Sequence, residues 1–545
     1  MSASAEALKH GHKSSGEFKP EEKRVIFASS LGTVFEWYDF YLYAVLAPFF
    51  AALFFPPGNQ TAALLSAFAA YAAGFLVRPF GALLFGRIGD LVGRKYTFLV
   101  TIVVMGSATF LVGLLPTFAS VGWAAPVLML LLRLLQGLAL GGEYGGAATY
   151  VAEHAPNHRR GYDTSWIQTT ATLGLFLALA VIYLCRSNMD AATFSSWGWR
   201  VPFLVSVILL VFSVYIRLKL HESPVFQQMQ SQGKGSKQPL TDSFLRYPNN
   251  KFVLLALLGA TAGQGVVWYT GQFYALFFLI LTLKLDYVSA YTLIALSLLI
   301  GTPFFIVFGW LSDKIGRLKI ILAGCLIAAV TYFPLFHGLT HYVNPGLEEF
   351  AATTPISVTA DPATCQFHLF VGPWSKFSDC DKAKDFLSKQ GLNFKSVDGA
   401  AGSKVVTEIG GAAAARIEGA DVKAIGDALK KGGYADGPDR SRINWFMTEL
   451  ILVIMVLYVT MVYGPIAAFL VELFPVRIRY TSMSLPYHIG NGWFGGMLPL
   501  TATALVAVTG DIYYGLWYPI VVALMTVVIG TLFLKEVKDR DIHHN

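Results

Sequence analysis

The sequence predicts an all-α membrane protein with twelve transmembrane helices in two six-helix halves and a small external insert of mixed α and β structure. Hydrophobic residues make up 55% of the chain and charged residues only 14%, whereas charge alone is about a quarter of a soluble domain. Twelve apolar stretches each approach the roughly 20 residues that a helix needs to cross a bilayer. A charged link with the pattern Gly-x-x-x-Asp-x-x-Gly-Arg at 86–94 recurs at 309–317, which indicates two related halves.

Short polar links separate the twelve stretches. Each stretch holds few charges, and the Gly and Pro inside many of them are tolerated by helices embedded in lipid. The polar first residues contain no short apolar core followed by a cleavage site, so we expect the first span to remain uncleaved. The stretches are centred near residues 40, 73, 106, 137, 175, 208, 266, 298, 328, 456, 496 and 524.

The distribution of Lys and Arg predicts the orientation of the chain. Basic residues gather in the links after even-numbered spans, as at 87–95, 159–160 and 314–319, while the opposite links hold almost none apart from Arg186 and Lys284. Because Lys and Arg favour the cytoplasmic side, both termini are expected inside. The formal net charge of +7 is therefore a topology signal, and no nucleic-acid surface is expected.

A second repeated link locates the insert. The pattern Glu-x-x-Pro-x-x-x-Arg at 153–160 recurs at 472–479, 319 residues later, whereas the first pattern recurs after 223 residues. The second half therefore carries about 96 extra residues, which polarity places after the ninth span. The predicted regions are a cytoplasmic tail (1–24), an N-terminal half (25–218), a central cytoplasmic loop (219–251), a C-terminal half (252–338 and 444–534), the external insert (339–443) and a second cytoplasmic tail (535–545).

The insert is expected to form a small mixed domain. Residues 365–371 and 404–407 are predicted strands, and 381–390 are a predicted short helix. Cys365 and Cys380 are the cysteines of this segment. Since they flank a predicted strand and turn in an oxidising compartment, we predict that they form a disulfide. The alternative is two unpaired thiols in a flexible loop.

Charged and polar groups inside the spans of the first half are candidate sites. Isolated charges at the centre of a membrane helix cost at least ~2.5 to 3.5 kcal/mol, so these groups must be paired or must bind protons and ions. Glu36, Asp39 and Tyr43 are spaced to share one helical face. Both readings stay open for the carboxylates Glu36, Asp39 and Glu143, which are candidates for proton coupling. The candidates for binding a solute in this half are Tyr43, Arg78, Arg133 and Gln136.

The second half offers mostly uncharged polar groups. In the seventh span the spacing keeps Gln264, Trp268, Tyr269 and Gln272 near one side of a helix, which suits hydrogen bonding and stacking on a small solute. The alternative is packing and hydrogen bonding between helices. In the eleventh span, Asn491 is a further candidate contact and His488 a candidate proton site near neutral pH.

The repeated links predict a gate on the cytoplasmic side. Glycine allows a tight reversal and close helix approach. The aspartates of the links can meet an arginine of the same link or the end of a neighbouring helix. We expect such contacts to break and re-form when the protein changes state. The candidate gate residues are Gly86, Asp90, Gly93, Arg94, Asp313 and Arg317 in the first repeat, and Glu153, Arg160, Glu472 and Arg479 in the second.

These motifs resemble those of a known family. The two Gly-x-x-x-Asp-x-x-Gly-Arg links resemble the signature of the major facilitator superfamily. The sequences at 35–40, 78–81, 133–145 and 197–203 are similar to its metabolite:proton symporter family, which includes permeases for α-ketoglutarate, citrate, shikimate and proline or betaine. The resemblance covers 25–338 and 444–534 and implies proton-driven uptake across a bacterial inner membrane by alternating access. It also implies roles for Arg78, Arg133, Glu36, Asp39 and Glu143.

Three classes of function compete as explanations of these residues. A symporter for a small carboxylate is favoured because arginines recognise anions with two parallel hydrogen bonds. A symporter for an osmolyte such as proline or betaine is the alternative, since Trp268, Tyr269 and Tyr274 suit a quaternary ammonium. A receptor or a membrane enzyme is the third, but no nucleotide loop, metal cluster or nucleophile is visible. The expected partners are a small-molecule substrate, protons and the lipid bilayer, with no cofactor, metal or nucleic acid and with a monomeric functional unit.

Overall fold

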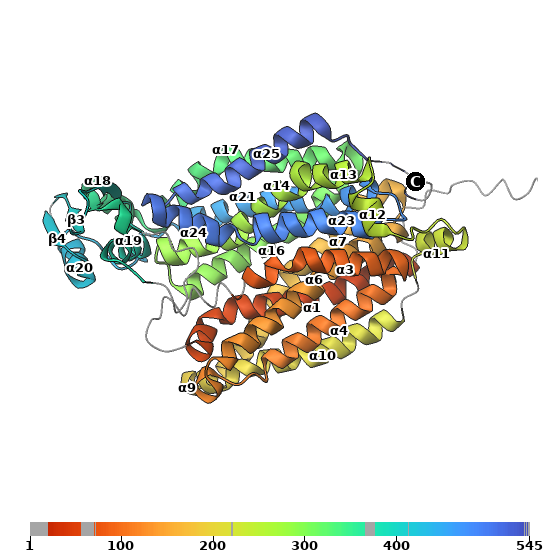
Figure 1. Ribbon diagram of the computed structural model, residues 1–545, viewed down its shortest axis with the longest axis horizontal. Coiled ribbons are helices and arrows are strands. Elements are labelled where there is room, and N and C mark those ends of the chain that lie inside the picture. Colours follow the sequence, from red (N-terminus) through yellow and green to blue (C-terminus); the bar gives the residue numbers. More distant parts are fainter. Residues whose placement is uncertain are drawn as a thin grey trace, which may run out of the picture.

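The computed structural model describes residues 20–55, 70, 72–219, 222–365, 376–411, 414–538, 540 and 542. Over this part of the chain the molecule is a long helical body with a small α/β lobe at one end (Figure 1). Nine helical segments of the described residues are long and apolar enough to cross a membrane. The expectation of a mostly helical membrane fold is therefore met.

One group of helices comes from the N-terminal part of the chain. Glycines set how closely they approach, because small residues allow membrane helices to touch. A Cβ on Gly141 would collide with the carbonyl oxygen of Arg78, and one on Gly81 with that of Leu138. The helices are α1 (Pro20–Phe54), α3 (Arg78–Leu91), α4 (Arg94–Val112), α5 (Phe118–Val121), α6 (Ala124–His154), α7 (Arg160–Gln168), α8 (Thr170–Ser187), α9 (Ala191–Ser196) and α10 (Val201–Leu218).

The second group follows the short cytoplasmic-loop helices α11 (Pro224–Ser231) and α12 (Pro239–Phe244). Its seventh and eleventh spans contain wider π-helical turns, which often mark functional sites. These turns are η3 (Leu257–Thr261), η4 (Thr270–Tyr274), η5 (Phe278–Thr282) and η8 (Ile489–Gly495). The helices are α13 (Asn249–Ala256), α14 (Ala262–Tyr269), α15 (Ala275–Phe277), α16 (Tyr287–Ile315), α17 (Arg317–Val343), α21 (Trp445–Tyr463), α22 (Ile466–Leu473), α23 (Arg479–His488), α24 (Leu498–Thr509) and α25 (Trp517–Phe533).

The two groups meet along pairs of related helices. Helix α3 packs against α23, and α7 packs against α16. The repeated links lie at this contact, where the backbone reverses before α4 and before α17. Gly93 has φ +138° and Gly316 has φ +118°, in the region that side chains disfavour. This requirement explains why both links keep a glycine at this place.

The lobe is a four-stranded sheet in the order β2-β1-β3-β4. Strand β1 pairs in parallel with β2, across a connection that contains α19, and antiparallel with β3. Side chains of β1, α19 and α20 form its buried core, including Val358, Leu387 and Leu429. The elements are α18 (Pro345–Thr353), β1 (Ile356–Ala360), α19 (Asp379–Lys389), β2 (Lys395–Asp398), β3 (Val406–Ile409), β4 (Ala415–Glu418) and α20 (Val422–Lys431).

The lobe is attached to loops of the second helix group. The backbone N–H of Phe394 donates to the carbonyl of Gly510 at 2.9 Å, and the Lys284 ammonium donates to the carbonyl of Lys389. Arg440 forms an ion pair with Asp286 at 3.2 Å. The lobe is thus anchored beyond its own two connections.

The predicted elements of the insert differ from the observed ones in register and number. The helix expected at 381–390 is α19, and the strand expected at 404–407 overlaps β3 by two residues. Of the strand expected at 365–371, residues 366–371 lie outside the described residues. Strands β1, β2 and β4 were not predicted, because each has only four or five residues. Helix α17 also continues to Val343, past the expected boundary at 338.

The disulfide leads to the first test. The structure joins Cys365 to Cys380 across 15 residues, a closure worth roughly 3 kcal/mol in the chain-entropy model. In cells, an impermeant maleimide added from outside is expected to label this pair only after reduction. The buried Cys185 and Cys325 are replaced by Ala in the background, so that the signal reports the pair alone. Labelling without a reductant would contradict the bridge.

Candidate functional site

Aromatic side chains close the centre of the molecule between the two helix groups. The rings of Trp37 on α1 and Trp268 on α14 lie 5.3 Å apart. Tyr144 on α6 stacks on Tyr487 of α23 at 3.7 Å. The hydroxyl of Tyr41 donates to Gln272 Oε1 at 3.4 Å. These contacts join helices of the two groups, so any opening of the centre must separate them.

Arg78 extends into this contact from the start of α3. Its guanidinium carbon lies 4.3 Å from the centroid of the Phe75 ring and 5.7 Å from that of Phe40. It also reaches the hydroxyl of Tyr269 on the opposite group. The Nε of Arg78 is buried and makes no hydrogen bond within the described part of the chain. A half-buried guanidinium beside aromatic rings is suited to bind an anion.

The polar residues of the second group are only partly brought together. Gln264 and Asn491 hydrogen-bond to each other in both directions, at 3.0 and 2.8 Å. They therefore satisfy each other, as expected for a packing contact between helices. His488 is buried, and neither ring nitrogen has a hydrogen-bond partner among the described residues. The same is true of the indole N–H of Trp268.

Arg133 is the second buried arginine near the centre. Its guanidinium carbon lies 4.1 Å from the centroid of the Tyr43 ring, and its Nη1 donates to Gln136 Oε1 at 2.7 Å. The amide of Gln136 donates to Thr109 Oγ1 at 2.7 Å. Thr109 donates in turn to Asp39 Oδ2 at 2.9 Å. Sequence analysis missed Thr109, since nothing in its local sequence separates it from other threonines in the spans.

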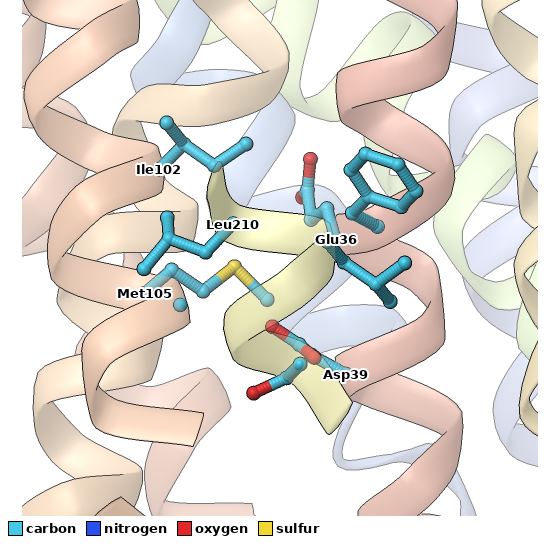
Figure 2. A pocket seen from close by; sticks show the side chains of 9 residues that line it. Glu36, Asp39, Ile102, Met105 and Leu210 are labelled. Carbon is cyan, nitrogen blue, oxygen red and sulfur yellow. The ribbon is translucent and has the colours of Figure 1, made fainter. Parts of the chain in front are cut away.

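Glu36 and Asp39 face the interior of the first helix group. Figure 2 shows both side chains on one helix opposite Ile102, Met105 and Leu210, around a cavity of about 10 Å³. That volume holds about one water molecule. The Oε2 of Glu36 is buried without a hydrogen-bond partner in the described structure.

Glu36 and Asp39 therefore lie within the first helix group and not at its contact with the second. Trp37 and Tyr41 occupy the face of α1 that meets the second group. Glu36 and Asp39, displaced around the same helix, meet α4 and α10 instead. The helical period of 3.6 residues makes the two sets face in different directions.

Glu143 is paired with an arginine that sequence analysis did not select. Its Oε1 lies 2.5 Å from Arg217 Nη2, and its Oε2 accepts from Thr101 at 2.6 Å. Neither Arg78 nor Arg133 fills this role, although both were considered as partners. Arg133 lies ten residues earlier on the same helix, about 15 Å away along its axis.

Ion pairs connect the two groups at the repeated links. Glu153 Oε1 lies 2.9 Å from Arg479 Nη1 and 3.6 Å from Arg94 Nη2. All three side chains are fully buried. In the related cluster, Glu472 Oε1 lies 2.8 Å from Arg160 Nη1 and 3.1 Å from Arg317 Nη2. Each glutamate therefore binds one arginine from its own group and one from the other.

The link aspartates contact both kinds of partner that the sequence suggests. Asp90 forms an ion pair with Arg94 at 2.9 Å and accepts from the backbone N–H of Thr481 at 2.8 Å. Asp313 forms an ion pair with Arg317 at 2.6 Å. It also accepts from the N–H of Gly161 at 2.8 Å. Negative charge is favourable at a helix N-terminus, and these contacts tie each link to the other helix group.

Carboxylates after the sixth and twelfth spans complete the links and were missed from sequence. Glu222 accepts from the N–H of Lys95 at 3.1 Å, and Glu536 accepts from the N–H of Arg317 at 3.0 Å. They cap the N-termini of α4 and α17. At the same contact Gly86 approaches the backbone of Thr481, where a Cβ would lie 2.9 Å from the Cα.

The sequence is similar to those of known transporters. A family model described as "Sugar (and other) transporter" matches residues 25–245. The chain is 34% identical over 323 residues to the shikimate transporter of Escherichia coli, covering 58% of this chain and 72% of that protein. It is 35% identical over 320 residues to the alpha-ketoglutarate permease of Escherichia coli, covering 59% and 72%. It is 34% identical over 322 residues to the proline/betaine transporter of Salmonella typhimurium, covering 58% and 64%.

Solved structures agree on the fold. A double-tryptophan mutant of XylE superposes with a TM-score of 0.63 over 96% of this chain and 98% of that chain, at 15% identity. The proton:xylose symporter XylE bound to 6-bromo-6-deoxy-D-glucose gives a TM-score of 0.60 at the same identity and coverage. The two related helix groups, the repeated links and the relatives agree. The chain belongs to the major facilitator superfamily, as a multi-pass inner-membrane transporter of the metabolite:proton symporter family and not an enzyme.

Proposed function

We propose that this protein takes up a small carboxylate together with protons, by alternating access between its two halves. The observation that carries the proposal is the position of Arg78. It lies between the helix groups with its guanidinium over Phe75. Its Nε is buried and has no hydrogen-bond partner among the described residues. A substrate carboxylate supplies the missing anion, and two relatives are named for carboxylate solutes.

A second candidate substrate is an osmolyte such as proline or betaine. The rings of Trp37, Trp268, Tyr269 and Phe273 cluster near Arg78, with Trp268 and Tyr269 4.8 Å apart. Aromatic faces attract a quaternary ammonium. A relative is named as a proline/betaine transporter. The carboxylate is preferred because it brings a net negative charge to Arg78, whereas proline and betaine are zwitterions with no net charge.

The proposed topology has twelve spans with both termini in the cytoplasm. Nine spans are recognisable by length and composition. The remaining three are α1, the segment that ends in α3, and the segment formed by α23, η8 and α24. The lobe lies at the opposite end of the body from α11 and α12 (Figure 1). Since the basic central loop is cytoplasmic, the lobe is external, and we propose a monomer as the functional unit.

The ion-pair clusters around Glu153 and Glu472 act as the cytoplasmic gate. They join the groups on the side where the links lie, so this arrangement is closed toward the cytoplasm. Opening must separate Glu153 from Arg479 and Glu472 from Arg160. Binding of substrate and proton lowers the free energy of opening this gate only through contacts that differ between the closed and open states.

Proton coupling rests on the buried carboxylates. Glu143 is neutralised by Arg217 at 2.5 Å, so its role is more structural than that of Glu36 and Asp39. These two line the small cavity in Figure 2. Asp39 accepts a hydrogen bond from the neutral hydroxyl of Thr109 at 2.9 Å. We assign Asp39 as the principal proton site, with Glu36 beside it and His488 as a further titrating group.

The first test of this function uses energised membrane vesicles and labelled α-ketoglutarate, shikimate, citrate and betaine. A protonophore is expected to abolish accumulation of the carboxylate, and replacement of sodium by potassium is expected to change nothing. Vesicles without the protein are the control. Sodium-dependent uptake that resists the protonophore would contradict proton coupling. Uptake of betaine alone would favour the second candidate.

The next test concerns the arginines. Arg78→Lys and Arg133→Lys keep the charge but lose the planar fork, so kcat/KM for uptake should fall about tenfold or more. Arg246→Lys, at an exposed cytoplasmic ion pair, is the matched control and should behave as wild type. Membrane levels are measured by blotting. Normal uptake by both Arg78→Lys and Arg133→Lys would return these arginines to a structural role.

The gate is tested by removing one shared charge. Glu472→Gln leaves Arg160 and Arg317 buried without their common anion, and breaking such a pair costs about 3–5 kcal/mol. Thermal unfolding of the purified protein should shift to lower temperature, and uptake should fall. Glu408→Gln breaks the exposed pair with Arg416 and should change little. Equal stability of the two variants would show that the cluster does not hold the halves together.

A further inference from the structure

We propose that Thr109 is a positioning residue that transmits the protonation state of Asp39 to Arg133. The inference deepens the proposed function and rests on it, since it assumes that Asp39 binds the coupled proton. Thr109 itself touches neither the substrate nor the cytoplasmic gate. It lies between a carboxylate on α1 and an arginine on α6, and its hydroxyl connects Asp39 to Gln136, which in turn contacts Arg133.

The chain of contacts is continuous and dry. Thr109 Oγ1 is 2.9 Å from Asp39 Oδ2 and 2.7 Å from Gln136 Nε2. Gln136 Oε1 is 2.7 Å from Arg133 Nη1. Thr109 is 0% exposed, Gln136 2% and Asp39 6%. With so little exposure, water cannot replace any of these bonds, and each polar atom depends on its neighbour in the chain.

The hydroxyl of Thr109 has two acceptors within reach but only one hydrogen to donate. Besides Asp39, the carbonyl of Met105 lies 3.0 Å from Oγ1, one turn earlier on the same helix. When Asp39 is ionised, the charged carboxylate is the stronger acceptor and takes the hydrogen. The carbonyl of Met105 then keeps only its bond within the helix.

Protonation of Asp39 reverses this bond. The new O–H of Asp39 donates to Thr109 Oγ1, whose two lone pairs accept from Asp39 and from Gln136. The hydrogen of Thr109 rotates to the carbonyl of Met105. One proton has been added, at Asp39, and no other bond is lost. Both protonation states therefore keep every partner satisfied, which allows Asp39 to load and release a proton without breaking the chain to Arg133.

Protonation of Asp39 changes how far the positive charge of Arg133 is offset. An ionised Asp39 partly offsets the guanidinium along the chain, and protonation removes that negative charge. Arg133 then attracts a substrate anion more strongly, and by reciprocity the anion favours the proton. The other charged groups near this site are Glu36 on the same helix, and Arg78, Glu143 and Arg217 on neighbouring helices. Tyr38 and Tyr43 are the nearby phenols.

The cavity gives the proton a place beside Asp39. Glu36 and Asp39 both line it, and it holds about one water molecule (Figure 2). A water there contacts the two carboxyl groups while Thr109 contacts Asp39 from α4.

The test compares three variants in proteoliposomes with labelled α-ketoglutarate, shikimate and betaine as probes. Thr109→Val removes the hydroxyl at nearly constant volume, and Thr109→Ser retains it. Thr97→Val is the matched control, because this buried threonine on the same helix bonds only to the carbonyl of Gly93 at 3.0 Å. The readouts are KM at two pH values on either side of neutrality and the rate of counterflow, which needs no net proton movement.

The expected result separates coupling from folding. In Thr109→Val, the ratio of the KM values measured at the two pH values should fall about fivefold or more toward one, which is the range of an ordinary coupling free energy. The rate of counterflow should stay within about twofold of wild type. Thr109→Ser should restore the pH dependence, and Thr97→Val should never lose it. An unchanged ratio in Thr109→Val, or equal losses in Thr109→Val and Thr97→Val, would overturn the proposal. Absence of any pH dependence in the wild type would instead overturn the proposed proton coupling.

Discussion

The compensation of buried charge is the constraint on which the rest of this structure depends. A charge removed from water costs several kcal/mol unless an opposite charge and hydrogen bonds meet it. At the contact between the halves, Glu153 and Glu472 each bind arginines from both helix groups. The same ion pairs therefore satisfy buried charge and determine how the halves sit against each other. A change of state must move these charges together, which makes the clusters a switch with few stable arrangements.

Two faces of α1 carry polar and aromatic side chains to different parts of the molecule. One face carries Glu36 and Asp39 into the N-terminal half, where Thr109 and a small cavity surround them. Another face carries Trp37 and Tyr41 to the second half. In the proposed mechanism, the proton site and the aromatic surface for a solute therefore lie on the same helix. In that mechanism, movement of α1, or of the side chains that link it to Arg133, couples the proton site to the solute surface.

Much of the fold could be predicted because it depends on local properties. Apolar length, basic links and repeated motifs located the spans, the two halves and the insert. The contacts of Asp90 and Asp313 with helix ends were among the expected partners. The residues of the candidate site were harder to predict from the sequence. Thr109 looks like any other threonine of the spans, and Arg217 looks like one more basic residue at the end of a helix. The π-helical turns η4 and η8 also shift faces that were inferred from a regular helix.

The sequence by itself determined the class of the protein, its repeated halves, its family and the set of residues too costly to bury alone. Those properties follow from composition, spacing and the energy of moving charge into lipid. Only the tertiary structure decided which groups pair. Arg217 meets Glu143 from 74 residues away, and Arg479 meets Glu153 from 326 residues away. Such partners lie on different helices, so the packing and rotation of whole helices, and not any local signal, select them.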